Sequence, residues 1–410
     1  MLMFLAHEQV VPRMLRPAAT TRDLRTTLFG RTYPSPLIVA PVGVQGIFHR
    51  DGEVAVAQVA ADLGLVFCFS SAASVGIETL AKEHDKAMAA VGKRIQTGNA
   101  AGRGESMAGV GGGGAAASSD AKTELQSVES PAKPEWMGEP SSAGDRWFQL
   151  YWPNSKPLTN SLLRRARQAG YSVLVVTLDT FSIGYRPWDL DLGYIPFLKG
   201  LGVQVGLEDP VFQACYRQRT GGKEIHDDID AASRMWLSDC YGRAHGWEEL
   251  RDLREEWEGP IVLKGIQCAE DAARAVDAGM EGIVVSNHGG RQVDGAVGSL
   301  EVLPEIVDAV RRKEAATGKK CTVLFDSGIR TGADVIKALC LGAQCVLVGR
   351  PWVYGLGIGG KEGVREALSG LLADLDTTMG LAGLSGVREC GREWVRRSET
   401  GGGGERFSSS

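Results

Sequence analysis

Short apolar runs recur along the chain, and segments with helical periodicity lie between them. The runs are rich in β-branched residues, apolar at consecutive positions, and closed by Gly, Pro or a polar residue. Strands of a parallel sheet are buried on both faces and have this pattern, whereas half-exposed strands alternate. The eight runs are PLIVAP (36–41), LVFCFSS (65–71), RWFQLY (146–151), SVLVVTLD (172–179), PIVLKG (260–265), GIVVSN (282–287), CTVLFDSG (321–328) and CVLVGRP (345–351).

The alternation of strands and helices predicts the fold class. Amphipathic helices are expected over 269–279 and 332–342, with Thr331 as the N-cap of the second. Eight β and α units in alternation predict a (β/α)8 TIM barrel, and a doubly wound open sheet is the alternative. The long connection 187–246 follows the fourth strand, so we expect it to cover the carboxyl-terminal mouth of the barrel.

Composition separates one folded domain from two segments that lack material for a core. Residues 97–145 contain GVGGGGAAASSD and few apolar side chains, which predicts a disordered insert. The tail 397–410 is predicted to be disordered as well, so the barrel domain should comprise 1–96 and 146–396. Because the insert lies between the second helix and the third strand, we expect it on the face opposite the chemistry.

Charge and residue content argue against several classes of protein. The chain has 45 Lys+Arg and 50 Asp+Glu, a net charge of −5 that does not favour nucleic acid or an anionic membrane. No apolar run approaches the roughly 18 residues of a membrane helix. The eight cysteines are scattered without a CxxC pair, so we expect reduced thiols, no metal site and a cytoplasmic location.

Polar residues gather at the carboxyl ends of the predicted strands, where TIM barrels carry their active sites. The seventh and eighth strands end in DSGIRTG (326–332) and GRP (349–351). Glycine backbone amides, the amino terminus of a helix and two arginines together predict a phosphate site. Ordinary tight turns that use glycine for backbone reasons are the alternative.

The motif SNHGGRQ (286–292) follows the sixth strand directly. His288 suits proton abstraction near neutral pH, and Arg291 suits bidentate binding of a carboxylate. Asp179, at the end of the fourth strand, is placed to orient His288, and Arg186 to supply a second cation. The alternatives are a solvated loop and a simple salt bridge between Asp179 and Arg186.

Lys264 closes a strand that is otherwise apolar, so it is either a ligand for substrate or cofactor or a snorkelling edge residue. Gln149 and Thr177 suit the edge of a heteroaromatic ring, although each is equally consistent with a satisfied core group.

Taken together, these motifs resemble the FMN-dependent α-hydroxy-acid oxidases and dehydrogenases, the family of glycolate oxidase, lactate oxidase and the flavin domain of flavocytochrome b2. The resemblance covers about 28–96 and 146–396. The matching stretches are SNHGGRQ, RWFQLYWP (146–153), VTLDT (176–180), IVLKG (261–265), FDSGIRTG (325–332) and VLVGRP (346–351). Three further stretches are most similar to the lactate 2-monooxygenase branch: APVGVQG (40–46), GYRPWDLDLGY (184–194) and DPVFQA (209–214).

The resemblance implies FMN-dependent oxidation of a lactate-like L-2-hydroxy acid to the 2-oxo acid or its decarboxylated product, with O2 as acceptor and a homo-tetrameric assembly. It implies that His288 is the base and that Asp179 orients it. Arg291, Arg186 and Tyr151 would bind the substrate, and Lys264 would stabilise negative charge on the reduced flavin. The implied cofactor contacts are Pro41, Val42, Gly43, Ser70, Gln149, Thr177, Lys264, Ser286, Asp326, Gly328, Arg330, Gly349 and Arg350.

The sequence departs from the family pattern in several places. The family has a substrate-binding tyrosine well upstream of the first strand, whereas Tyr33, the first tyrosine here, abuts that strand. Ala72 stands where glycolate oxidase has a tryptophan, which implies a roomier pocket. The 97–145 insert is not a family feature, and no haem-binding domain is present. The alternatives are therefore a flavin-binding barrel with impaired catalysis and a flavin-free phosphate-binding lyase or isomerase.

Overall fold

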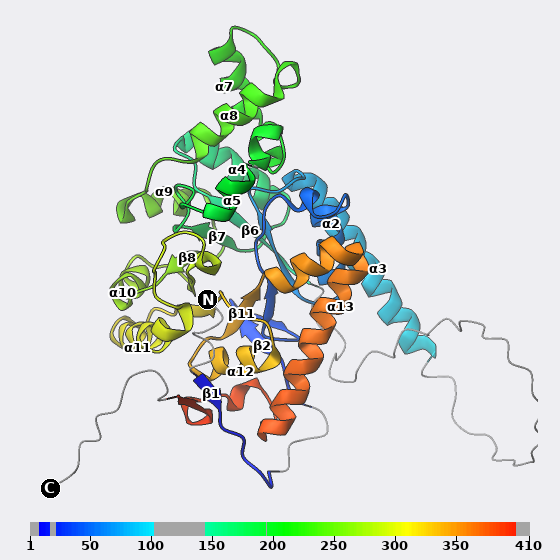
Figure 1. The fold of residues 1–410 in the computed structure, drawn as a ribbon, viewed down its shortest axis with the longest axis vertical. Coiled ribbons are helices and arrows are strands. Elements are labelled where there is room, and N and C mark those ends of the chain that lie inside the picture. Colours follow the sequence, from blue (N-terminus) through cyan, green and yellow to red (C-terminus); the bar gives the residue numbers. More distant parts are fainter. Residues whose placement is uncertain (1–7, 17–21, 102–143, 194, 399–410) are drawn as a thin grey trace, which may run out of the picture.

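The computed structural model describes residues 8–16, 22–101, 144–193 and 195–398 (Figure 1). Eight parallel strands close into a barrel in the order β10-β11-β4-β5-β6-β7-β8-β9, which confirms the predicted TIM barrel and rules out the open sheet. Each strand coincides with one predicted run. The strands are β4 (Leu37–Val39), β5 (Val66–Ser70), β6 (Arg146–Tyr151), β7 (Leu174–Thr177), β8 (Ile261–Ile266), β9 (Gly282–Val285), β10 (Thr322–Phe325) and β11 (Cys345–Val348).

Helices surround the barrel and cover the outer faces of its strands (Figure 1). The helices that follow the eight strands are α2 (Gly52–Leu63), α3 (Ile77–Ala101), α4 (Lys156–Gln168), α9 (Leu250–Glu256), α10 (Ala269–Asp277), α11 (Ser299–Thr317), α12 (Gly332–Cys340) and α13 (Arg350–Ala382). Both helices predicted in detail are present as α10 and α12. The Thr331 hydroxyl accepts a bond from the Asp334 amide at 3.3 Å, and the Asp334 carboxylate accepts one from the Thr331 amide at 3.1 Å, so the predicted cap is confirmed.

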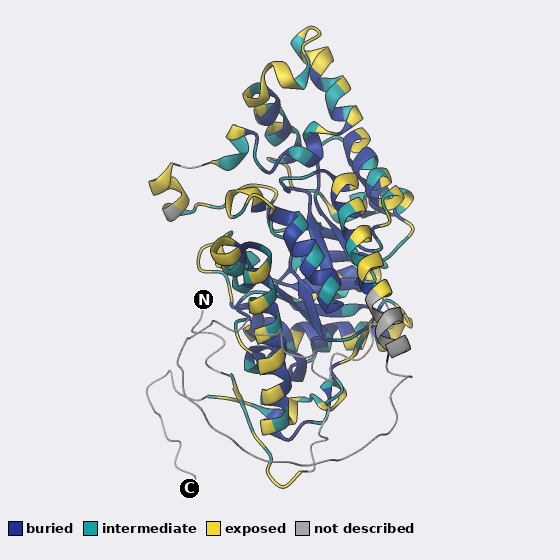
Figure 2. Cartoon of the chain, turned by 90° about the vertical axis from the view of Figure 1, so that its right-hand side faces the viewer, coloured by how far each residue is buried: buried dark blue, intermediate teal, exposed yellow. Residues whose placement is uncertain are grey.

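The apolar side chains form two cores because successive residues of a strand point to opposite faces. Strand residues and helix residues together build the outer core, and Figure 2 shows the barrel strands as mostly buried. The inner core contains strand residues such as Val175, Val262 and Val284, with no residue from the surrounding helices. The hairpin of β2 (Thr26–Leu28) and β3 (Arg31–Tyr33) also packs on this inner core, against Trp147 through Phe29.

The connection after β7 is partly a cover for the mouth and partly a separate helical protrusion. Arg186 contacts Gln292 in the loop after β9, and Gly202 lies against Ala72 in the loop after β5, so the chain between them crosses the mouth as predicted. The helices α7 (Pro210–Thr220) and α8 (Ile229–Cys240) project beyond the end of the barrel (Figure 1). Other short helices in this connection are α5 (Pro187–Leu192) and α6 (Gln204–Leu207).

The predicted boundaries of the two non-core segments are wrong by a few residues. Helix α3 continues to Ala101, and Asp145 is buried, where its carboxylate accepts bonds from Tyr33 Oη at 2.8 Å and Ser172 Oγ at 2.6 Å. Arg397 belongs to β12 (Val395–Arg397), which pairs with β1 (Glu8–Val10). Composition does not reveal such long-range pairing. The remaining parts of both predictions, 102–143 and 399–410, lie outside the described residues.

Among the residues that the structure describes, no helix combines the length and the apolar character that crossing a membrane requires.

Asp145 is a buried acceptor for two hydroxyls, so the substitution Asp145→Ala should lower the free energy of unfolding by about 2–4 kcal/mol, because it leaves these donors unpaired. Urea denaturation of the purified protein measures this loss. The matched control is Asp85→Ala, whose carboxylate is 63% exposed beside Arg146 and should contribute less than about 1 kcal/mol. Equal losses for the two variants would contradict the assignment.

Candidate active site

A buried ammonium group lies at the centre of the mouth of the barrel. Lys264 Nζ donates to Ser286 Oγ at 3.0 Å and lies 3.6 Å from Asp179 Oδ2 and 3.5 Å from Asp326 Oδ2. The lysine side chain is 6% exposed, so it does not snorkel to the surface. Burial alone would lower the pKa of Lys264, but the two carboxylates outweigh burial and raise this pKa above its ordinary value.

The backbone next to Lys264 makes room for one of these carboxylates. Gly265 has a φ of +109°, and the pairing of β8 with β9 shifts register between Lys264 and Ile266. A Cβ on Gly265 would lie 3.0 Å from Asp179 Oδ2 and 2.9 Å from Asp179 Cβ. Glycine therefore permits both the positive φ and the close approach of Asp179.

His288 lies at the start of the loop after β9, in a left-handed conformation with a φ of 55°. Its Nδ1 is 2.8 Å from Asp179 Oδ1, and Thr180 Oγ1 lies 3.0 Å from the same nitrogen. This arrangement engages Nδ1 and leaves Nε2 for a substrate. The imidazole lines a cavity at the mouth of the barrel, which we call the mouth cavity.

The charges around this pair favour a neutral imidazole beside an ionised carboxylate. Burial raises the pKa of Asp179, but the charge of Lys264 and the bond from His288 outweigh burial and lower this pKa to about 2. Burial and the charge of Lys264 lower the pKa of His288 below its ordinary value, and Asp179 opposes that shift. At neutral pH the imidazole is therefore poised to accept a proton.

Two guanidinium groups of the predicted site, those of Arg186 and Arg291, lie close enough to repel each other. Arg186 Nε donates to the carbonyl of Arg291 at 3.0 Å, and its Nη1 lies 3.7 Å from Asp189, so it forms no simple salt bridge with Asp179. Burial and the like charge of Arg291 lower the pKa of Arg186. Because like charges repel, such a pair favours binding of an anion between them.

Sequence reasoning missed the glutamine that ends the SNHGGRQ motif. Gln292 Nε2 donates to the carbonyls of Asp179 and Ser182, each at 2.8 Å, while its Oε1 accepts from Arg186 Nη2 at 2.6 Å. One side chain therefore joins the loop after β7 to the loop after β9. The motif contained this residue, but no local pattern assigned a role to it.

Sequence reasoning also missed a second tyrosine at the site. Tyr241 follows α8, and its ring centroid is 5.7 Å from that of Tyr151, the predicted substrate contact at the end of β6. Burial raises the pKa of both phenols, so both remain protonated donors. Tyr33 takes no part in the site, because its hydroxyl donates to Asp145.

Most of the predicted cofactor contacts surround the mouth cavity, whose volume is about 130 Å³. The predicted site residues that line it are Pro41, Val42, Lys264, His288, Arg291, Asp326, Gly328, Arg330, Gly349 and Arg350. Four of these side chains are basic residues other than histidine, and one is acidic, which suits an anionic ligand.

The remaining predicted cofactor contacts lie outside the lining of this cavity. Ser70 Oγ donates to Gln149 Oε1 at 2.8 Å, and Gln149 Nε2 is buried with no hydrogen-bond acceptor among the described residues. An unpaired buried donor is costly, so the amide fits a bound ring that supplies an acceptor, as FMN does. Ser286 Oγ holds Lys264, Gly43 packs on Ala72, and Thr177 lines a different cavity.

The predicted phosphate site keeps its arginines, but the amino terminus of α12 already has protein partners. The amino terminus of α12 is capped by Asp334, and the amide of Gly332 donates to Asp374 Oδ2 at 2.6 Å. These carboxylates occupy the terminus of α12, whereas α13 begins at Arg350, which lines the mouth cavity together with Gly349. Burial and the charges of Arg291 and Arg330 lower the pKa of Arg350. A bound phosphate would offset this repulsion between like charges.

Comparisons with known proteins agree with this geometry. The sequence matches the family described as FMN-dependent dehydrogenase over residues 4–98 and 104–397. An FMN-dependent alpha-hydroxy acid dehydrogenase of Penicillium citrinum is 48% identical over 95% of this chain and 80% of its own length. The L-lactate oxidase of Lysinibacillus sphaericus is 30% identical over 92% of this chain and 79% of its length. A crystal structure of mandelate oxidase with (S)-2-phenylpropionate has a TM-score of 0.66 and 33% identity, and covers 95% of this chain and 86% of that one.

The electrostatics of the site predict opposite effects of two substitutions on the pKa of His288. Asp179→Asn removes the charge that stabilises the imidazolium and should lower this pKa further, whereas Lys264→Met removes a repelling charge and should raise it. NMR titration of protein with labelled histidines measures both shifts. In the unaltered protein we expect His288 to titrate below its ordinary pKa of 6.5. Shifts of the same sign in both variants would contradict this account.

Gly265→Ala should also lower the pKa of His288, because the added methyl group displaces Asp179 from the imidazole. The matched control is Gly279→Ala, since Gly279 has a φ of +76° but no atom within 4 Å of an added Cβ. Both variants place an alanine at a positive φ and so introduce backbone strain. The difference between them therefore reports the steric clash of the added methyl group with Asp179. The same NMR titration tests this prediction, and an equal shift in the two variants would refute the role given to Gly265.

Proposed function

Because the chain belongs to the FMN-dependent dehydrogenase family and FMN is its cofactor, we propose that it oxidises a lactate-like L-2-hydroxy acid to the 2-oxo acid, with O2 as the electron acceptor. The observation that carries this proposal is the His288–Asp179 pair, joined at 2.8 Å beside two arginines. The pair supplies a base, and the arginines supply a site for the carboxylate of the acid.

In the proposed reaction, Arg291 and Arg186 bind the substrate carboxylate and thereby place the carbinol group next to His288. The imidazole Nε2 accepts the proton that leaves the substrate, and Asp179 stabilises the imidazolium that results. Tyr151 donates a hydrogen bond to the substrate near the reacting carbon. FMN held at this site would supply the acceptor for the two electrons of the oxidation.

The residues that would hold FMN are arranged around its two chemically different ends. Lys264 and the unpaired Gln149 amide suit the polar edge of the ring, and the lysine charge favours the anionic reduced form. Arg330 and Arg350 suit the phosphate. Pro41, Val42, Gly43, Ser70, Thr177, Ser286, Asp326, Gly328 and Gly349 complete the proposed set of contacts.

Two alternatives are less well supported. A flavin-free lyase or isomerase conflicts with the family to which the chain belongs. A barrel with impaired catalysis is the second alternative. However, the ring of Tyr241 lies 5.7 Å from that of Tyr151, the proposed substrate contact, and this second phenol supports an active enzyme.

The small side chain of Ala72 supports acceptance of acids bulkier than lactate. Ala72 is buried, and its carbonyl lies 2.7 Å from the position of a Cβ on Gly43. We therefore propose that 2-hydroxy acids with larger side chains, such as mandelate, are oxidised in addition to lactate. A release of peroxide and 2-oxo acid identifies an oxidase, and release of the decarboxylated acid identifies a monooxygenase.

Anaerobic addition of L-lactate or L-mandelate to the FMN-loaded protein should bleach the flavin absorption bands, whereas D-lactate should not. The variant His288→Gln should retain the flavin bands. Its flavin should be reduced at least about 100-fold more slowly, because the base is lost. Stopped-flow absorbance measures both rates. Readmission of O2 should restore the bands with formation of peroxide or of the decarboxylated product. Bands that persist with every acid, or a wild-type rate for His288→Gln, would overturn the proposal.

A further inference from the structure

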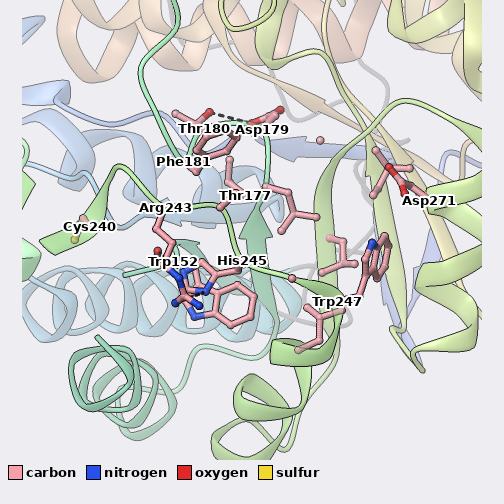
Figure 3. A pocket seen from close by; sticks show the side chains of 17 residues that line it. Trp152, Thr177, Asp179, Thr180, Phe181, Cys240, Arg243, His245, Trp247 and Asp271 are labelled. Atoms are coloured by element: carbon pink, nitrogen blue, oxygen red, sulfur yellow. Dashed lines mark hydrogen bonds between the residues drawn. The ribbon is translucent and has the colours of Figure 1, made fainter. Parts of the chain in front are cut away.

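A second cavity lies behind Asp179, between the ends of β7 and β8 and the helices α9 and α10 (Figure 3). Its volume is about 280 Å³, and none of the residues that line it lines the mouth cavity. That volume is close to the lower end of the range of ligand sites, about 300–1,000 Å³. The space is therefore distinct from the mouth cavity, although Thr177 and Asp179 of the proposed site line it, and it is large enough for a small molecule.

Aromatic side chains form much of the wall of this cavity. Trp152 stacks on His245 with ring centroids 4.1 Å apart and an angle of 7° between the rings, and Trp247 lies on the other side of the space (Figure 3). Phe181 is 48% exposed and lies at the edge of the cavity. Leu250 adds an aliphatic surface. Such walls suit an aromatic or aliphatic body and can also attract a cation through their π faces.

The basic side chains around the cavity already have a protein partner. Glu249 Oε2 lies 2.7 Å from Arg243 Nη2 and 3.0 Å from His245 Nδ1, so one carboxylate engages both side chains. The charge of Arg243 is thus compensated on the protein side, and it offers little attraction to an anionic ligand.

Two carboxylates line the cavity from opposite ends. Asp271 lies in the first turn of α10, where its carboxylate accepts a hydrogen bond from the thiol of Cys268. Asp179 is 10% exposed, and its Oδ2 accepts no hydrogen bond among the described residues, although Lys264 lies 3.6 Å away. A buried acceptor without a donor is costly, so a ligand that carries N–H groups would satisfy it.

We propose that this cavity is a second ligand site for a small organic cation, an ammonium group attached to an aromatic or aliphatic body. The ammonium pairs with Asp271, the body lies against Trp247 and Leu250, and a donor such as a hydroxyl at the far end of the body reaches Asp179. Because Asp179 holds His288 at 2.8 Å, a ligand in this cavity alters the geometry and charge of the catalytic base. This second step rests on the proposed function, whereas the binding step does not.

Tyramine is a suitable probe, and 4-ethylphenol is its neutral control of nearly the same shape. Calorimetry and tryptophan fluorescence with the FMN-loaded protein should show saturable binding of tyramine and about tenfold weaker binding of 4-ethylphenol. No saturable binding, or equal affinity for the two compounds, would overturn the proposal.

Three variants localise the binding. Asp271→Asn should weaken tyramine binding about tenfold, while Glu270→Gln, which changes the neighbouring exposed carboxylate in the same helical turn, should have no effect. Ala244→Trp places a large ring at an exposed position of the cavity wall and should abolish binding. Wild-type affinity in Asp271→Asn or Ala244→Trp, or displacement of tyramine by L-lactate, would overturn the assignment to this cavity.

Coupling to the base is tested by the rate of anaerobic flavin reduction with and without tyramine. The rate should change in the wild-type protein and stay constant in Ala244→Trp. Binding without any change in rate would overturn the coupling. Failure of every acid to bleach the flavin in the absence of tyramine would count against the proposed function alone, because calorimetry reports binding independently.

Discussion

A buried ammonium group holds the mouth of the barrel together. Lys264 at the end of β8 faces Asp179 after β7, Ser286 after β9 and Asp326 after β10, so four strand ends meet on one charge. An isolated ammonium in this position would be costly, and the two carboxylates and the hydroxyl compensate for the loss of water. The position of Asp179, and therefore of His288, depends on this charge.

The same charge sets the chemistry of the imidazole. Lys264 keeps Asp179 ionised and disfavours the imidazolium of His288, while Asp179 binds Nδ1 and directs Nε2 away from itself. The result is an imidazole whose neutral form is favoured and whose protonated form Asp179 would stabilise. Gln292 helps to hold this geometry, because its side chain links the loop that carries Asp179 to the loop that carries His288.

The strands and most of the site were predictable because their physical causes are local. Strands buried on both faces must be apolar at successive positions, so every barrel strand coincides with an apolar run. Barrel chemistry lies at strand ends, so Lys264, His288 and Asp326 stood out as polar breaks in such runs. Asp145 was misplaced in the insert because its burial depends on Tyr33 and Ser172, which are distant in sequence.

The sequence by itself determined the barrel and the cofactor family and singled out His288 as the candidate base, since each leaves a periodic or contiguous pattern. Only the tertiary structure decided that Tyr241 joins Tyr151, that carboxylates close the amino terminus of α12, and that a second cavity lies behind Asp179. The reason is physical. These features arise from contacts between segments whose separation along the chain is set by the closure of the barrel, and no local pattern of residues encodes a distance in space.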